Sequence, residues 1–335
     1  SIISQTTYFG SGDRAVRVEG SIGHNQSPAP WGISELVIQG ETVEFEGPVG
    51  GLLSSITALA TERLAFRHNT AVLGIGTVII EAPQVELNTG VTSKTGDTIL
   101  YGDIQFTGAT LLAAGADRRV VVKGSLFGHG ESNLTIRGQQ GALSEVILRG
   151  EVQTGGRVLI DATGANMAKR VELNVVTAGD MIVRAHDLRL SGNLMAYYGN
   201  MEIAAPATLE DDIHVVGKGE RKFVRFHQSL DGAHQLSIEA PDSSVSFLGN
   251  VGHETPLTSM KIISAGTNVL GKSIEVATTF SWTIQAGSAL PGKLQLARGQ
   301  KIVAGESIVL NISGVFQNVN GKQEGLLAPL VEVNV

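Results

Sequence analysis

A short apolar pattern interrupted by glycine recurs along the whole chain of 335 residues. Apolar residues alternate with other residues, a glycine follows on the apolar phase, and an apolar residue comes two positions later. The full matches are VRVEGSI (Val16–Ile22), VEFEGPV (Val43–Val49), VVVKGSL (Val120–Leu126), VILRGEV (Val146–Val152), LRLSGNL (Leu188–Leu194), VSFLGNV (Val245–Val251) and LNISGVF (Leu310–Phe316). The partial matches are LVIQG (Leu36–Gly40), IQFTG (Ile104–Gly108), LTIRG (Leu134–Gly138) and IHVVG (Ile213–Gly217). Because alternation is typical of half-buried β-strands, the chain is predicted to consist of many similar strands.

The glycine within the pattern indicates where each strand bends. Glycine inside a strand is unfavourable unless the chain turns there or another backbone approaches closely. The pattern therefore predicts a strand, a corner, and the start of the next face of a coil. Stacked coils form a β-solenoid, in which each turn buries apolar side chains and forms hydrogen bonds with the turns on either side. The spacing between matches is irregular, which indicates a degenerate repeat with turns of unequal length.

We therefore expect an all-β fold, a single elongated β-solenoid. Residues 1–31 are expected to form an N-terminal strand and cap region, and residues 32–335 the solenoid repeats. At about 20–25 residues per turn, the chain would make about 13–17 turns. The segment Leu52–Leu73 is predicted as strand, although its alanines and charged residues also suit a short helix. Two or three β-sandwich domains are the alternative, because alternation and turns alone do not exclude them.

The composition is that of a folded chain with a large core. Hydrophobic residues make up 42% of the sequence, there are 42 glycines, and there is no cysteine. These values argue against disorder and against a disulfide framework. The formal net charge is −7, and the longest basic runs are pairs such as Arg118–Arg119 and Arg221–Lys222. Nucleic acid is therefore not expected as a partner. No apolar run reaches ~18 residues, so membrane insertion is not expected either.

Two copies of the pattern share a longer signature. VEFEGPVGGLLSSI (Val43–Ile56) and VSFLGNVGHETPLTSM (Val245–Met260) both continue through a short variable turn into Leu-x-Ser and an apolar residue. The second copy, with HQSLDGAHQLSIEAPDSS (His227–Ser244) before it, resembles the degenerate repeats of filamentous-haemagglutinin-like and autotransporter-like bacterial surface proteins. The resemblance covers about Phe223–Val276 and is weaker over Val43–Leu64. It implies a right-handed parallel β-helix, secreted or on the cell surface, whose repeats are structural and carry no catalytic residues.

These observations lead to a functional expectation. The chain is expected to be an extracellular structural or adhesive β-solenoid of a bacterial cell surface or matrix. It is not expected to be an enzyme or to have catalytic, cofactor-binding or metal-binding residues. Ser1–Tyr8 and Leu330–Val335 both read as strands without a charged cap. The expected partners are therefore copies of itself or adjoining repeats, joined end to end as in a filament. Host or matrix glycans are a further expected partner.

A polysaccharide hydrolase or lyase on a β-helix scaffold is the alternative function. Gly128-His129-Gly130 is similar to the Gly-His-Gly of polygalacturonase-like enzymes, and Glu210-Asp211-Asp212 supplies the adjacent carboxylates that such hydrolysis uses. In that family, however, the paired aspartates precede Gly-His-Gly, whereas here they follow it. The Asn-Thr-Asp and Arg-Ile-Lys elements of the family are also missing. A glycine loop and a solvated acidic turn are therefore the preferred interpretation.

Other candidate groups are weaker still. His186-Asp187 would approach a triad only if the turns stack so that Asp161 or Asp180 lies beside it. Gly10–Asp13 is glycine-rich, but no helix follows that would bind a phosphate. The eight histidines are scattered and do not match a zinc pattern. The oxygen ligands considered for calcium are Glu210, Asp211 and Asp212, or Asp231 and Asp242. The N-glycosylation sequons begin at Asn25, Asn133 and Asn311.

Overall fold

The computed structural model describes residues 6–10, 15–18, 35–50, 53–67, 72–139, 141–163, 170–286, 292–318 and 326–334. The chain forms two compact units, Ser1–Glu172 and Leu173–Val335. Over the described residues all regular structure is β-strand, and no helix that could cross a membrane is present. The strands pair in parallel and stack in about 12 turns. The predicted β-solenoid is therefore confirmed, and the β-sandwich alternative, which needs antiparallel sheets, is wrong.

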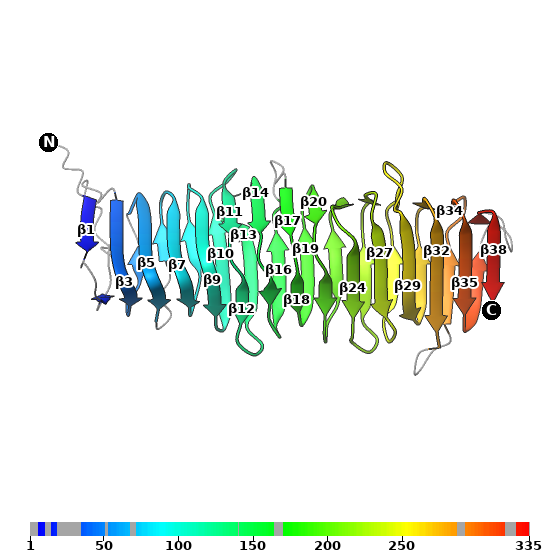
Figure 1. Cartoon of the computed structure of the whole chain (residues 1–335), viewed down its shortest axis with the longest axis horizontal. Helices are drawn as coiled ribbons and strands as arrows, with labels where there is room; N and C mark the ends of the chain where they lie inside the picture. Colours follow the sequence, from blue (N-terminus) through cyan, green and yellow to red (C-terminus); the bar gives the residue numbers. More distant parts are fainter. Residues whose placement is uncertain are drawn as a thin grey trace. The chain divides into compact units, whose positions relative to one another are not determined.

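The first unit contains strands of very unequal length (Figure 1). They are β1 (Thr6–Gly10), β2 (Val16–Val18), β3 (Glu35–Phe45), β4 (Val49–Gly50), β5 (Ser55–Phe66), β6 (Val72–Gly74), β7 (Val78–Leu87), β8 (Val91–Ser93), β9 (Thr98–Phe106), β10 (Ala109–Ala114), β11 (Arg119–Val122), β12 (Leu126–Gly128), β13 (Asn133–Gly138), β14 (Glu145–Leu148), β15 (Val152–Gln153) and β16 (Arg157–Asp161). The strand β17 (Arg170–Leu173) runs over the boundary between the units in the sequence. The segment Leu52–Leu73 contains β5, so its prediction as strand is confirmed over Ser55–Phe66.

Each turn of the first unit has three strand segments. The long strands β3, β5, β7 and β9 each contain two of them, and their mutual register shifts between the two parts, for example between Gly40 and Thr42. The strand β9 shows this division, because its first part pairs with β11 and its second part with β12. The third segment of each turn lies in the separate sheet that contains β4, β6, β8, β10, β13 and β16. We call these three segments the first, second and third faces of the turn.

The second unit repeats the same organisation. Its strands are β18 (Val176–Ala178), β19 (Asp180–Arg184), β20 (Leu188–Leu190), β21 (Leu194–Ala196), β22 (Met201–Ala204), β23 (Ala207–Leu209), β24 (Ile213–Gly217), β25 (Phe223–Phe226), β26 (Leu230–Asp231), β27 (Gln235–Ala240), β28 (Ser244–Phe247), β29 (Ser259–Ala265), β30 (Thr267–Leu270), β31 (Ile274–Val276), β32 (Thr279–Gln285), β33 (Gly292–Leu296), β34 (Ile302–Ala304), β35 (Ser307–Ile312), β36 (Gly314–Asn318), β37 (Leu326–Leu327) and β38 (Leu330–Asn334). The predicted C-terminal strand is thus present as β38, which pairs with β35.

The length of a turn varies along the chain while the residue pairing is kept. On the first face, Ile79 pairs with Ile99, Ile99 with Val121, and Val121 with Ile147. The differences in residue number are 99 − 79 = 20, 121 − 99 = 22 and 147 − 121 = 26. This variation confirms the degenerate repeat. The expected 13–17 turns were slightly too many, because the corners take up more residues than a minimal turn needs.

In the match VSFLGNV (Val245–Val251), the apolar phase of the pattern forms part of the core. Val245 and Phe247 are fully buried and Val251 is 1% exposed, whereas Leu248 is 38% exposed. The ring of Phe247 stacks on Phe226 of the preceding turn, with centroids 5.2 Å apart. Ser246 lies on the opposite phase of the strand, between buried Val245 and Phe247, yet it is only 6% exposed. Its small side chain lies between its larger register partners, Arg225 and Val269.

Several glycines of the pattern lie where backbones of successive turns approach closely, although Gly108, with nothing within 4 Å of a Cβ, does not. A Cβ atom on Gly124 would overlap the backbone of Gly102, and one on Gly150 would overlap the backbone of Gly124. A Cβ atom on Gly249 would overlap the backbone carbon of Gln228. The corner interpretation of the pattern is therefore confirmed at these positions.

The expected boundary between a cap region and the repeats at residues 31 and 32 remains a prediction. Residues 19–34 and Ser1–Gln5 lie outside the described part of the chain. Residues 11–14, which include most of the glycine-rich segment Gly10–Asp13, also lie outside it, as does Asn25.

A glycine-to-alanine pair tests the corner contacts. Gly249→Ala should destabilise the fold by about 1–3 kcal/mol, because the added methyl group overlaps backbone that has little room to move. Gly271→Ala is the matched control one turn away, since a Cβ there lies 3.3 Å from the Cα of Leu248. It should cost under about 1 kcal/mol. Denaturant melts of the two variants measure the difference, and equal costs would contradict the corner interpretation.

A second pair tests the core. Phe247→Ala should cost roughly 3–5 kcal/mol, because it removes a fully buried ring that stacks on Phe226. Leu248→Ala, at a position 38% exposed, should cost under about 1 kcal/mol. The same denaturant melts apply, and a reversed order of the two costs would mean that the strand is shifted by one residue.

Candidate functional site

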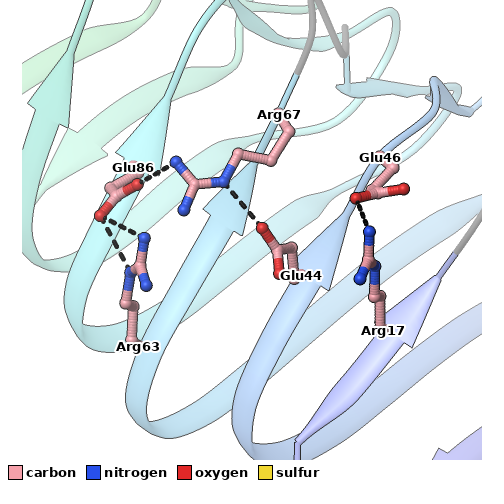
Figure 2. Close-up of polar contacts among 6 residues, drawn as sticks. All are labelled: Arg17, Glu44, Glu46, Arg63, Arg67 and Glu86. Carbon is pink, nitrogen blue, oxygen red and sulfur yellow. Dashed lines mark hydrogen bonds and ion pairs between the residues drawn. The ribbon is translucent and has the colours of Figure 1, made fainter.

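Charged side chains form a set of ion pairs on the second face of the first unit (Figure 2). The set involves the strands β2, β3, β5 and β7 and the residues that directly follow β3 and β5. We call this set the charged ladder, and it consists of a linked group of four and a neighbouring pair: Glu44, Arg63, Arg67 and Glu86, and Arg17 with Glu46. Three arginines and three glutamates give it a net charge of zero.

The register of the strands brings these residues together. Glu44 pairs with Ala65, and Ala65 pairs with Glu86 on the next turn. Ala65 points outward, because its neighbours Leu64 and Phe66 are the buried inward residues of β5. It is nevertheless only 1% exposed. The small side chain leaves space between the two glutamates, and arginine side chains cover it.

Arginines connect the glutamates of different turns. Arg67 Nε donates to Glu44 Oε1 at 2.8 Å, and its Nη1 donates to Glu86 Oε2 at 2.8 Å. Figure 2 shows the Arg67 side chain between these two carboxylates. Arg63 Nε donates to Glu86 Oε1 at 2.9 Å, so Glu86 accepts bonds from two arginines. Arg17 pairs with Glu46 at the β2 end of the ladder.

The ionisation of the ladder follows from these contacts. The hydrogen bond from Arg67 holds the pKa of Glu44 below its ordinary value, against the opposing effect of burial. The hydrogen bond from Arg63 lowers the pKa of Glu86 in the same way, and the same bond raises the pKa of Arg63. All these groups therefore stay charged near neutral pH. Such an arrangement holds successive turns together and is poorly suited to proton transfer.

The acidic turn Glu210–Asp212 is also engaged in contacts between turns. Glu210 accepts a bond from Arg189 at 2.8 Å, and Arg189 also faces Asp187 at 3.6 Å. Asp212 accepts the backbone N–H of Gln235 at 2.9 Å. These carboxylates therefore orient other groups of the second unit and do not converge on a common point.

The candidate histidine of Gly128–Gly130 lies in an exposed turn of the first unit. His129 donates its backbone N–H to Phe106, and its carbonyl oxygen accepts from the hydroxyl of Ser132. Glu210, Asp211 and Asp212 belong to the second unit. The order of these motifs in the sequence already argued against a polygalacturonase-like site. The structure adds that the histidine and the acidic residues belong to different units.

Three further candidate aspartates accept hydrogen bonds within a turn or between turns. Asp161 accepts from the backbone and hydroxyl of Thr163, and Asp180 accepts the backbone N–H of Asn200. Asp231 is 8% exposed and accepts the backbone N–H of Glu254 at 2.9 Å. Across the described ranges, no group of three or more His, Asp or Glu residues is placed to hold a metal ion.

Two sequon asparagines also bond to the adjoining turn. Asn133 Oδ1 accepts the backbone N–H of Arg157 at 2.7 Å. Asn311 Oδ1 accepts from Asn334 at 2.8 Å. Their side chains therefore take part in the stacking of turns.

The sequence alone did not reveal the charged ladder. Its bonded partners are 19 to 29 residues apart, since 86 − 67 = 19 and 46 − 17 = 29. The available signal was the opposite charge at outward positions one turn apart, as in Glu44 with Arg67 and Arg63 with Glu86. Turn length had to be known before that signal could be read.

Comparisons with known proteins give one partial relationship. Deoxyribonuclease CdiA of Dickeya dadantii (strain 3937) is 27% identical to this chain over 185 residues. The aligned stretch covers 47% of this chain and 6% of that protein. No protein-family profile matches the sequence, and no solved structure matches it. The expected surface-protein family is therefore supported only by this partial match and by the solenoid fold.

That relationship corrects two expectations from the sequence. The chain was expected not to be an enzyme and not to have nucleic acid as a partner, whereas the similar protein is named a deoxyribonuclease. Both expectations are wrong, because the sequence did not justify excluding enzymatic activity or nucleic acid. Net charge averages over the whole chain, whereas contacts with nucleic acid depend on a local set of groups. A search for linear motifs likewise cannot find catalytic groups that only the stacking of turns would bring together.

The ladder predicts a specific dependence of stability on pH. Because the pKa of Glu86 is lowered in the folded state, its contribution is present above the pKa of the unfolded chain. It is lost as the pH falls through the lower folded value. Glu86→Gln should therefore cost about 1 kcal/mol near pH 7, the scale of a small surface network, and progressively less as the pH falls below the ordinary range of a carboxyl group.

Thermal melts between pH 3 and 7 measure this effect, with Glu62→Gln as a control outside the ladder, at an exposed position where the register of β5 shifts. The control should follow the wild type at every pH. A Glu86→Gln cost that does not shrink in acid would show that the ladder contributes through packing alone.

Proposed function

We propose that this chain is a structural or adhesive β-solenoid segment of a large bacterial surface or secreted protein. The observation that carries the proposal is the stacking itself. Glycine corners, the charged ladder and the aspartate and asparagine side chains all serve contacts between turns. A fold built this way extends by adding turns and presents side chains at a fixed spacing.

The partial similarity to Deoxyribonuclease CdiA supports the proposal that this chain is a segment of a much longer protein. A match that spans 47% of this chain fills only 6% of the relative. A solenoid within so long a protein would act as a scaffold for its other parts. The resemblance to filamentous-haemagglutinin-like repeats over Phe223–Val276 agrees with a position outside the cell.

Cleavage of DNA is a second candidate function, because the relative is named a deoxyribonuclease. The two candidates are compatible, since a scaffold and a catalytic site can belong to one protein. Incubating the purified chain with plasmid DNA and magnesium tests the second directly. Cleavage that copurifies with the chain would assign catalysis to this segment.

Surface labelling tests the first candidate. An epitope inserted after Glu254 should leave the fold intact, because His253, Glu254 and Thr255 lie in an exposed loop between β28 and β29. Intact cells that produce the tagged protein should bind the antibody as strongly as permeabilised cells. An insertion after Ile262, a buried residue of β29, is the matched control and should abolish the fold. Labelling of the loop epitope only after permeabilisation would contradict an extracellular position.

A further inference from the structure

Aromatic and basic side chains gather at one corner of the second unit, where the second face of a turn meets the third. Two tyrosines directly follow β21, and the loop between β24 and β25 lies beside them on the next turn. We call this surface the aromatic–basic corner, and it consists of Tyr197, Tyr198, Lys218, Arg221, Lys222 and Arg225. The sequence alone showed only the basic pair of this set, because the tyrosines join it through the stacking of turns.

The two tyrosines supply the exposed rings of the corner. Tyr198 is 75% exposed. Its ring centroid lies 6.0 Å from that of Tyr197, with the two ring planes 38° apart. Most of Tyr198 is therefore open to a ligand.

The loop of the next turn brings basic side chains to these rings. Lys218 Nζ lies 5.5 Å from the centroid of the Tyr197 ring. A Cβ on Gly219 would lie 3.1 Å from the carbonyl oxygen of Tyr198 and 2.5 Å from Cγ of Lys222. The glycine therefore lets the loop lie close to the tyrosines, with Lys222 beside it.

Arg225 supplies a second planar surface. Its Cζ lies 4.4 Å from the centroid of the Phe223 ring, and the Phe223 backbone N–H donates to Asn200 Oδ1. Arg225 pairs in register with Glu202, but Glu202 Oε1 lies 3.3 Å from His227 Nε2 instead. The guanidinium therefore lies against a ring and not against a carboxylate.

The positive charges of the corner are not neutralised as those of the charged ladder are. In the part of the chain that the structure describes, none of its four basic side chains forms an ion pair with a carboxylate. Residues 218–225 carry four bases and one acid, or 4 − 1 = +3. Asp242 on the following turn lowers the excess to +2, but it contacts Arg221 only through its carbonyl oxygen. Because charges beyond about 8 Å are largely screened at physiological salt, this local excess can attract an anion despite the net charge of −7.

We propose that the aromatic–basic corner binds single-stranded nucleic acid. Phosphates lie against Lys218, Arg221 and Lys222, and bases stack on Tyr198 and on the guanidinium of Arg225. Such binding tolerates many sequences, because every base has a flat π face. Bases within a double helix are already stacked on one another, so a duplex binds less well. The proposal concerns binding alone and does not depend on cleavage of DNA by this chain.

The size and chemistry of the corner define the ligand further. Seven residue steps from Lys218 to Arg225 reach at most about 25 Å, which is room for about seven nucleotides at 3.4 Å each. An acidic polysaccharide would match the charges equally well. It has no planar bases, however, to stack on the guanidinium of Arg225. The combination of charge with planar surfaces therefore favours nucleic acid.

Fluorescence anisotropy tests the stacking. The probe is a labelled oligothymidylate of about 12 nucleotides, and an abasic oligomer of the same length supplies phosphates without bases. The full chain should bind the oligothymidylate at least about tenfold more tightly than the abasic probe, which is the scale of stacking one base on a ring. Tyr198→Ala should weaken binding of the oligothymidylate about 5- to 100-fold and leave the abasic probe unaffected. Tyr198→Phe keeps the ring and should bind as the wild type does.

A salt series tests the phosphate contacts. Each phosphate neutralised on a single strand contributes about 0.7 to the slope of log affinity against log salt concentration. Arg221→Gln should therefore weaken binding of both probes and lower the slope by about 0.7. Lys261→Gln removes an exposed charge of β29 away from the corner. It is the matched control and should change neither quantity, and circular dichroism checks that every variant is folded.

Three results would overturn the proposal. One is equal affinity of the wild type for the oligothymidylate and the abasic probe. Another is a Tyr198→Ala effect of the same size on both probes. The third is tighter binding of polygalacturonate or of a DNA duplex than of the single strand at equal charge concentration. That last result would make the corner a site for acidic polysaccharide or for double-stranded DNA.

Discussion

Parallel hydrogen bonding between successive turns is the constraint on which the other features of this fold depend. Because the strands pair in parallel and in register, each residue lies beside its counterpart one turn away. A property of one position is therefore repeated as a column through the stack. Stacked phenylalanines show this in the core, where the ring centroids of Phe45 and Phe66 are 4.8 Å apart. Glycine at the corners, aliphatic residues on one face and opposite charges on another follow the same rule.

The first unit carries ion pairs between turns on two neighbouring faces. On the second face, the arginines and glutamates of the charged ladder neutralise one another across three turns. On the first face, Arg119 pairs in the same way with Asp97 of the preceding turn, at 2.9 Å. A surface whose charges are satisfied within the chain stabilises the stack that carries it.

Much of the fold could be predicted from local sequence, and the reason is physical. Alternation reports which side of a strand is buried, so Val245 and Phe247 were placed correctly in the core. Glycine reports close backbone approach, so Gly124, Gly150 and Gly249 marked corners. The ladder could not be predicted, because pairing Arg67 with Glu44 and Glu86 requires the length of each turn. The burial of Ser246 could not be predicted, because it depends on the size of side chains in neighbouring turns. The wrong exclusion of nucleic acid arose from treating net charge as a local property, and that of an enzyme from searching only for linear motifs.

In this fold, the number of residues in a turn can change without any change in the pairing between turns. Between Ile79 and Ile147, successive turns differ by as many as six residues, yet their pairing is unbroken. The additional residues are accommodated at the corners, so an insertion there changes the outline of one turn and leaves every column in place. Lineages of such chains can therefore gain and lose loops without refolding. New surface chemistry can arise on one turn at a time while the underlying lattice of hydrogen bonds is inherited unchanged.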